Sequence, residues 1–178
     1  MGSRFAISVL AAALAAATLA TAAVPEPQGV PPRLRPSANE VASLRLTGSG
    51  VMIYQCRATL TNPNAYAWYY VAPDATLYDG GHEVARMTSP NLIEGLSDPS
   101  SLSGVVRASQ AATGGLPWTL AQAIPMGDSG IFAGVTSFQR LNTRGGMPPA
   151  TGCSSDNVGE ESRIAFDADY YFYRKRGS

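Results

Sequence analysis

A concentrated group of polar side chains in this 178-residue sequence lies between positions 139 and 146. It contains five hydrogen-bond donors, which are Gln139, Arg140, Asn142, Thr143 and Arg144. Arginine and amide donors suit a carboxylate, a sulfate or a sugar, and the glycines at 145 and 146 let the backbone approach a ligand closely. Because the segment follows a predicted strand, we interpret it as a binding loop. The alternative is that these donors satisfy buried backbone carbonyls and anchor the segment that leads to Cys153.

Aromatic side chains form a second candidate surface, because amphipathic rings stack on sugars and planar ligands. The candidates are Tyr54, Trp68, Tyr69, Tyr70 and Trp118. Most of them are expected in the core, and strand alternation sends Tyr69 to the face opposite Trp68 and Tyr70. The predicted ligand-binding set is the five donors together with Trp68 and Trp118. We expect a shallow polar pocket lined by Arg140 and a tryptophan.

Two carboxylates, Asp167 and Asp169, are two positions apart and so share one face of a predicted strand. A pair of carboxyls within about 10 Å of each other in a cleft could act as acid and base in a hydrolase or lyase, and carboxylates also bind calcium. Glu160 and Glu161 are further candidates for this chemistry. The apolar residues on the opposite strand face favour aspartates that point into solvent. An enzyme of this kind, acting on an extracellular substrate, is the alternative to a non-catalytic binding or envelope-associated domain.

Other catalytic and metal patterns are incomplete. The Gly-Asp-Ser-Gly run at 127–130 is similar to the nucleophile loop of trypsin-like proteases, but the one histidine of the chain, His82, lies in a predicted turn. One histidine is too few for a typical zinc site. The Gly-Ser-Gly run at 48–50 lacks the third glycine of a dinucleotide-binding turn. We therefore predict no catalytic residue, no metal ligand and no cofactor.

The first 23 residues predict export. Arg4 precedes an apolar run from Phe5 to Leu19, and Ala20-Thr21-Ala22 matches the small-residue pattern of a signal peptidase site. The run is shorter than the roughly 20 apolar residues of a membrane-spanning helix. We expect a signal peptide at 1–23, no membrane anchor after its cleavage, and a secreted protein in the extracellular space or the periplasm.

Charge and composition narrow the partners and the domain count. Thirteen basic residues balance 13 acidic ones, so the formal net charge is zero and no field favours nucleic acid. We expect a small polar ligand or an extracellular polymer instead. Five prolines between 25 and 36 predict an extended, mobile spacer at 24–36, with an ordered arm along the sheet as the alternative. Residues 37–178 fit one domain.

The two cysteines, Cys56 and Cys153, are expected to form a disulfide, because an exported chain matures where thiols oxidise. The sequence has no C-x-x-C spacing, which disfavours a redox-active pair, although free buried thiols remain an alternative. The bond would close a loop of about a hundred residues and stabilise the fold by roughly 4–5 kcal/mol in the chain-entropy model.

Alternation of apolar and polar residues with a period of two predicts an all-β fold, a single antiparallel sandwich or a barrel-like domain. Strands are expected at 41–46, 51–57, 67–72, 76–78, 83–87, 105–109, 118–123, 131–140 and 164–174. Turns are expected at 48–50 and at Asp79-Gly80-Gly81. The predicted core faces hold Met52, Tyr54, Cys56, Ile164, Phe166, Ala168, Tyr170 and Phe172.

Several ordered sequence pieces resemble one family of exported bacterial and fungal proteins, a domain of unknown function. These pieces are residues 50–56, Trp68, 72–79, 117–118, 135–140, 142–146, 152–153 and 168–173. The resemblance runs from Val41 to Arg174, and it implies one secreted domain and names no activity. The chain departs from the family pattern at 85–94, where members carry a histidine and a tryptophan that are absent here.

Overall fold

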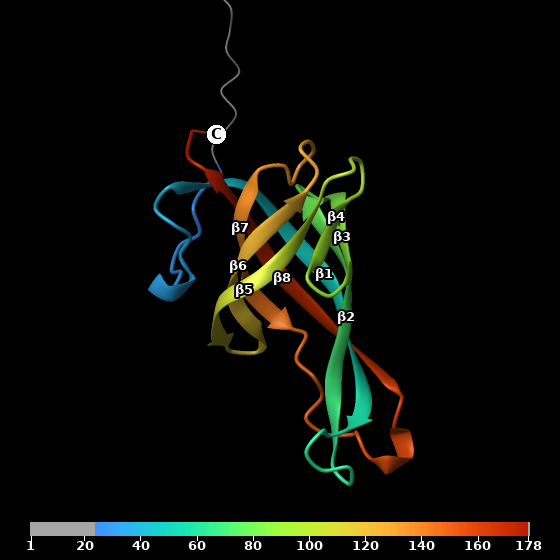
Figure 1. The fold of residues 1–178 in the computed structure, drawn as a ribbon. Helices are drawn as coiled ribbons and strands as arrows, with labels where there is room; N and C mark the ends of the chain where they lie inside the picture. Colours follow the sequence, from blue (N-terminus) through green and yellow to red (C-terminus); the bar gives the residue numbers. More distant parts are fainter. Residues whose placement is uncertain (1–23, 178) are drawn as a thin grey trace, which may run out of the picture.

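Eight antiparallel strands, each paired with the next along the chain, form a closed barrel in the computed structural model, which describes residues 24–177 (Figure 1). The strands are β1 (Glu40–Ala58), β2 (Tyr66–Asp79), β3 (His82–Ser89), β4 (Leu92–Gly95), β5 (Ser101–Ala112), β6 (Gly115–Met126), β7 (Val135–Gly145) and β8 (Glu161–Lys175). Two short 3₁₀ helices, η1 (Pro32–Leu34) and η2 (Ser155–Asn157), lie outside the strands. The all-β prediction is confirmed, in its barrel form. The predicted signal peptide lies outside the described residues.

Pairing between the first and last strands closes the barrel. Strand β1 pairs with β8 from Glu40↔Lys175 to Gln55↔Glu161, and its second half also pairs with β2. This closure pairs the two strands that would be the edges of an open sheet, and the second half of β1 is hydrogen-bonded on both sides. Between residues 24 and 177, no helical segment is long and apolar enough to cross a membrane.

The predicted turn at residues 48–50 is wrong, because β1 runs straight through it. A Cβ on Gly48 would lie 2.6 Å from the ring of Tyr170, and one on Gly50 would lie 2.3 Å from the Asp74 carbonyl oxygen. Glycine is needed at both positions because groups on neighbouring strands approach the backbone closely, which is a common reason for glycine inside a strand. The turn predicted at Asp79-Gly80-Gly81 is confirmed, with both glycines at positive φ.

The β1–β2 hairpin extends beyond the barrel, and the segment between β7 and β8 lies beside it (Figure 1). The predicted disulfide joins the two: the sulfurs of Cys56 and Cys153 are 2.02 Å apart. The indole Nε1 of Trp68 adds a hydrogen bond of 2.9 Å to the carbonyl of Thr151. The long β7–β8 connection is therefore fastened to the hairpin at two neighbouring points.

The barrel interior is filled by alternate residues of each strand. On β8 the inward side chains are Phe166, Ala168, Tyr170 and Phe172, all at most 5% exposed, with Ile164 partly buried against them. On β1, Met52, Tyr54 and Cys56 are equally buried. Both predicted core faces are thus confirmed. A one-residue shift of register would turn these side chains outward, so the apolar pattern fixes the register of the closing strands.

The segment at 24–36 lies along the outside of the barrel and corresponds to the ordered-arm alternative (Figure 1). We call it the N-terminal arm. Its Leu34 side chain is fully buried and packs with Val30 in a second apolar cluster that contains Leu141 and Tyr173. Burial of these apolar side chains stabilises the packing of the arm on the outside of the barrel.

Strand β7 extends further than predicted. It begins at Val135 rather than 131 and continues to Gly145, so the predicted binding loop is largely strand. A shift of register between Leu141 and Arg144 lets the strand continue, with Asn142 at a φ of 52°. Asparagine tolerates this left-handed conformation better than most residues. The short strand β4 was not predicted from the sequence.

Leu34→Ala tests whether the arm stabilises the barrel. We expect the free energy of unfolding in urea to fall by about 2–5 kcal/mol, because the substitution opens a cavity at a fully buried site. Leu60→Ala is the matched control, since Leu60 is 97% exposed at the end of the β1–β2 hairpin and should change stability little. Equal effects of the two substitutions would mean that the arm does not contribute.

Candidate ligand-binding site

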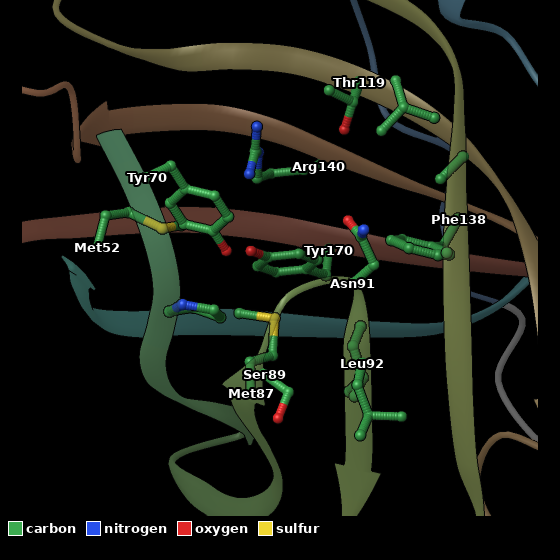
Figure 2. Close-up of a pocket in the computed structure, with 15 residues that line it drawn as sticks. Met52, Tyr70, Met87, Ser89, Asn91, Leu92, Thr119, Phe138, Arg140 and Tyr170 are labelled. Carbon is green, nitrogen blue, oxygen red and sulfur yellow. The ribbon is translucent and has the colours of Figure 1, made fainter. Parts of the chain in front are cut away.

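The barrel contains a cavity of about 90 Å³ that is partly open to solvent, and Figure 2 shows the residues that line it. Its polar lining residues are Tyr70, Ser89, Asn91, Thr119, Arg140 and Tyr170. The apolar ones are Met52, Pro73, Met87, Leu92, Ile93, Val106, Ala121 and Phe138. One water molecule needs only about 10–15 Å³, so the cavity has room for a group of several atoms.

Arg140 reaches the cavity from β7, where it pairs with Thr119 on β6 and Tyr170 on β8. Its Nη2 donates a hydrogen bond of 3.1 Å to the carbonyl of Pro117, while its buried Nε has no partner. The ion pairs found among residues 24–177 do not include Arg140. A guanidinium therefore lies inside the barrel without a carboxylate to balance its charge.

Two tyrosines lie beside this guanidinium. Figure 2 shows the hydroxyl groups of Tyr70 and Tyr170 directed toward one another, with Arg140 on the same side of the cavity. Burial raises the pKa of Tyr170 to about 12, although the charge and a hydrogen bond of Arg140 act in the opposite direction. Burial also raises the pKa of Tyr70. Both phenols are therefore neutral at physiological pH and can donate hydrogen bonds.

The apolar part of the cavity depends on a missing side chain. A Cβ on Gly104 would lie 2.5 Å from the ring of Phe138, so glycine lets this ring occupy the interior. The ring of Phe138 also stacks on Phe172, with 5.8 Å between the centroids. At the β3–β4 turn, Asn91 has a φ of 60° and brings a side-chain amide to the edge of the cavity.

Of the seven residues predicted to bind a ligand, Arg140 alone lines this cavity among the described residues. Gln139 faces the other side of β7, where it donates to the Leu34 carbonyl and accepts a hydrogen bond from Tyr173. Thr143 donates to the Leu116 carbonyl. Gln139, Arg140 and Thr143 thus each bond to a backbone carbonyl, as the alternative interpretation expected. Asn142 and Arg144 are exposed.

The two tryptophans do not face the cavity. Trp68 is bonded to Thr151 in the hairpin, and Trp118 packs in the apolar cluster under the N-terminal arm. The expected pocket lined by Arg140 and a tryptophan is therefore corrected to one lined by Arg140 and two tyrosines. The apolar pattern of β8 predicts only a core position for Tyr170. Tyr170 lies beside Arg140 because the two residues are paired in the β7–β8 register. No local sequence pattern indicates this pairing.

The predicted carboxylates lie on the outer face of β8. Asp169 accepts hydrogen bonds from Arg45 at 3.1 Å and from Asn142 at 2.7 Å, whereas Asp167 is exposed. Glu160 and Glu161 are exposed as well. The aspartates border a shallow depression on the barrel surface and do not lie in an enclosed cleft. The described residues contain no group of three or more metal-ligating side chains.

A family model described as "Protein of unknown function (DUF3455)" matches residues 36–103 and 80–174 of the chain. The matched segments cover all eight strands of the barrel except the last residue of β8. No curated protein and no solved structure matches the chain.

Tyr170→Phe tests the raised pKa through stability. The folded-state pKa of Tyr170 lies above its ordinary value. The neutral phenol therefore contributes to the free energy of unfolding below about pH 10, and this contribution is lost as the pH rises toward 12. The increase from about 10 to about 12 corresponds to about 3 kcal/mol. We expect the wild-type free energy of unfolding to decline over this range and Tyr170→Phe, which cannot ionise, to decline less. Urea unfolding at pH 8 and pH 11 measures the difference, and parallel declines would contradict the assignment.

Proposed function

The chain belongs to the family described as a protein of unknown function (DUF3455), and we propose that it is a non-catalytic, secreted protein that binds a small ligand in the cavity of its barrel. One observation carries the proposal: Arg140 lies inside the barrel with an unpartnered Nε and no balancing carboxylate. Arg140 is partly buried, so solvent reaches only part of its charge, and an anionic ligand that replaces this solvent supplies an acceptor and the opposite charge.

The barrel supports this function by its size. An eight-stranded barrel has an interior that either is filled by side chains or holds one small ligand. Here large side chains fill most of the interior, and the space that remains is lined by Arg140 together with smaller residues such as Ala121 and Ser89. A cavity that is already formed in the folded chain is typical of small-molecule sites. A cavity of about 90 Å³ suits a small molecule better than a polymer.

Location outside the cell is supported by two separate features. The first 23 residues have the pattern of a signal peptide. The Cys56–Cys153 disulfide is a bond that persists in oxidising compartments. The alternative function, a carboxylate-dependent hydrolase or lyase, has no comparable support, because Asp169 is occupied by Arg45 and Asn142 on the outer face.

Val106→Trp, which obstructs the cavity, tests the proposal. Val106 lines the cavity and is 53% exposed, so a tryptophan there can cover the opening without disturbing the core. Val105→Trp is the matched control, since Val105 is 41% exposed and does not line the cavity. Thermal unfolding of both variants and of the wild type is measured with small organic acids, amides and sugars.

We expect at least one compound to stabilise the wild type and Val105→Trp but not Val106→Trp. At a tenfold excess over Kd, the stabilisation is about 1.4 kcal/mol, or a few degrees in Tm. If no compound stabilises the wild type, or if both tryptophan variants respond equally, the cavity is not the binding site.

A further inference from the structure

We propose that the ligand of the cavity is a small organic carboxylate, bound by Arg140 and the two tyrosine hydroxyls through its carboxylate group and by apolar side chains through its body. This inference rests on the proposed function and adds the chemical class of the ligand. It is carried by the distribution of charge, hydrogen-bond donors and apolar surface around the cavity.

Charge selects an anion. Arg140 is the one charged side chain among the described residues that line the cavity, and the lining contains no aspartate or glutamate. Electrostatic attraction is stronger inside a protein than in water, so a single unbalanced guanidinium favours an anion over a neutral molecule of the same shape. A cationic ligand would be repelled.

The guanidinium further favours a carboxylate among anions. One arginine balances one negative charge, whereas a phosphate dianion would remain partly unpaired in a site with no second cation. Arginine also presents a planar fork that matches the geometry of a carboxylate. In Arg140 the Nη2 is bonded to Pro117, but the buried Nε retains a hydrogen to donate.

The tyrosines provide further donors on the same side. The hydroxyls of Tyr70 and Tyr170 point toward one another, and all three residues line the same cavity (Figure 2). Because burial raises the pKa of both phenols, they stay neutral and donate to an anion instead of repelling it. A carboxylate has two oxygens that together accept about four hydrogen bonds, so it can use the guanidinium and both phenols at once.

The remaining lining is suited to a hydrocarbon body. It includes Met52, Met87, Leu92, Ile93 and Phe138. Each apolar carbon that leaves water on binding contributes to affinity, and the flexible methionines adapt to different shapes. In Figure 2, Leu92 and Phe138 lie on the side of the cavity away from Tyr70 and Met52. The ligand is therefore a short aliphatic or single-ring aromatic carboxylate.

Titration calorimetry of the purified protein compares two carboxylates with their neutral amides: benzoate with benzamide, and hexanoate with hexanamide. Inorganic phosphate and sulfate are titrated separately. We expect at least one carboxylate to bind at least about tenfold more tightly than its amide, because the amide has lost the charge that pairs with Arg140. Phosphate and sulfate should bind more weakly than that carboxylate.

Arg140→Gln tests the recognition group, with Arg144→Gln as the matched control on the same strand. Arg144 is exposed and outside the cavity, so its substitution should leave carboxylate affinity unchanged. Arg140→Gln should weaken carboxylate binding at least about tenfold and reduce the preference over the amide. Should Arg140→Gln fail to fold, the ¹⁵N-labelled arginine Nε–H signals of the wild type give an independent measurement. The signal of an unpartnered Nε–H should move when benzoate or hexanoate is added, and an unmoved set of signals would overturn the inference.

Other outcomes separate this inference from the proposed function. If amides and carboxylates bind equally and Val106→Trp blocks both, the cavity binds ligands but the carboxylate assignment is wrong. Phosphate or sulfate binding as tightly as both carboxylates would replace the assignment with an inorganic anion. If none of these compounds binds and no other compound stabilises the wild type, both proposals fail.

Discussion

Closure of the sheet between β1 and β8 is the constraint on which the rest of the molecule depends. Once these two strands are paired from Glu40↔Lys175 to Gln55↔Glu161, the pleat assigns every strand residue to the interior or the exterior. On β8, Tyr170 becomes an interior residue and its neighbour Tyr171 an exterior one. The composition of the cavity therefore follows from the register of strands that are far apart in sequence.

Strand β7 connects the two faces of the barrel wall. Arg140 points into the cavity, and the adjacent Gln139 is fully buried on the other side, bonded to the N-terminal arm. Two neighbouring residues of β7 thus face opposite sides of the barrel wall, one toward the cavity and the other toward the N-terminal arm. Packing on the outer face restricts the backbone that positions the guanidinium, and a restricted backbone is what a preformed binding site requires.

Features determined by local sequence were predictable, and those determined by contacts between distant strands were not. The apolar alternation of β8 and the Asp79-Gly80-Gly81 turn depend on adjacent residues, so both were predicted correctly. Gly48 was misread as a turn residue because its reason for being glycine is the ring of Tyr170 on another strand. The cavity itself was not predictable, since Arg140 and Tyr170 meet only through the β7–β8 register. Arg140 was predicted from the sequence and does line the cavity, but it was expected in a loop, and the four donors predicted with it lie outside the cavity.

The requirements of binding and of stability oppose one another at Arg140. The Arg140 Nη2 is satisfied by the Pro117 carbonyl, but its Nε is not, and an unsatisfied buried donor typically costs about 1–3 kcal/mol. Nearby phenols reduce this cost little, because as neutral groups they supply dipoles and no opposite charge. The remaining stability must come from elsewhere, and the structure provides it in the closed strand ladder, the apolar interior and the Cys56–Cys153 bond. A scaffold stabilised in these ways can keep the Arg140 Nε unpaired, and the ligand that we propose would supply its acceptor.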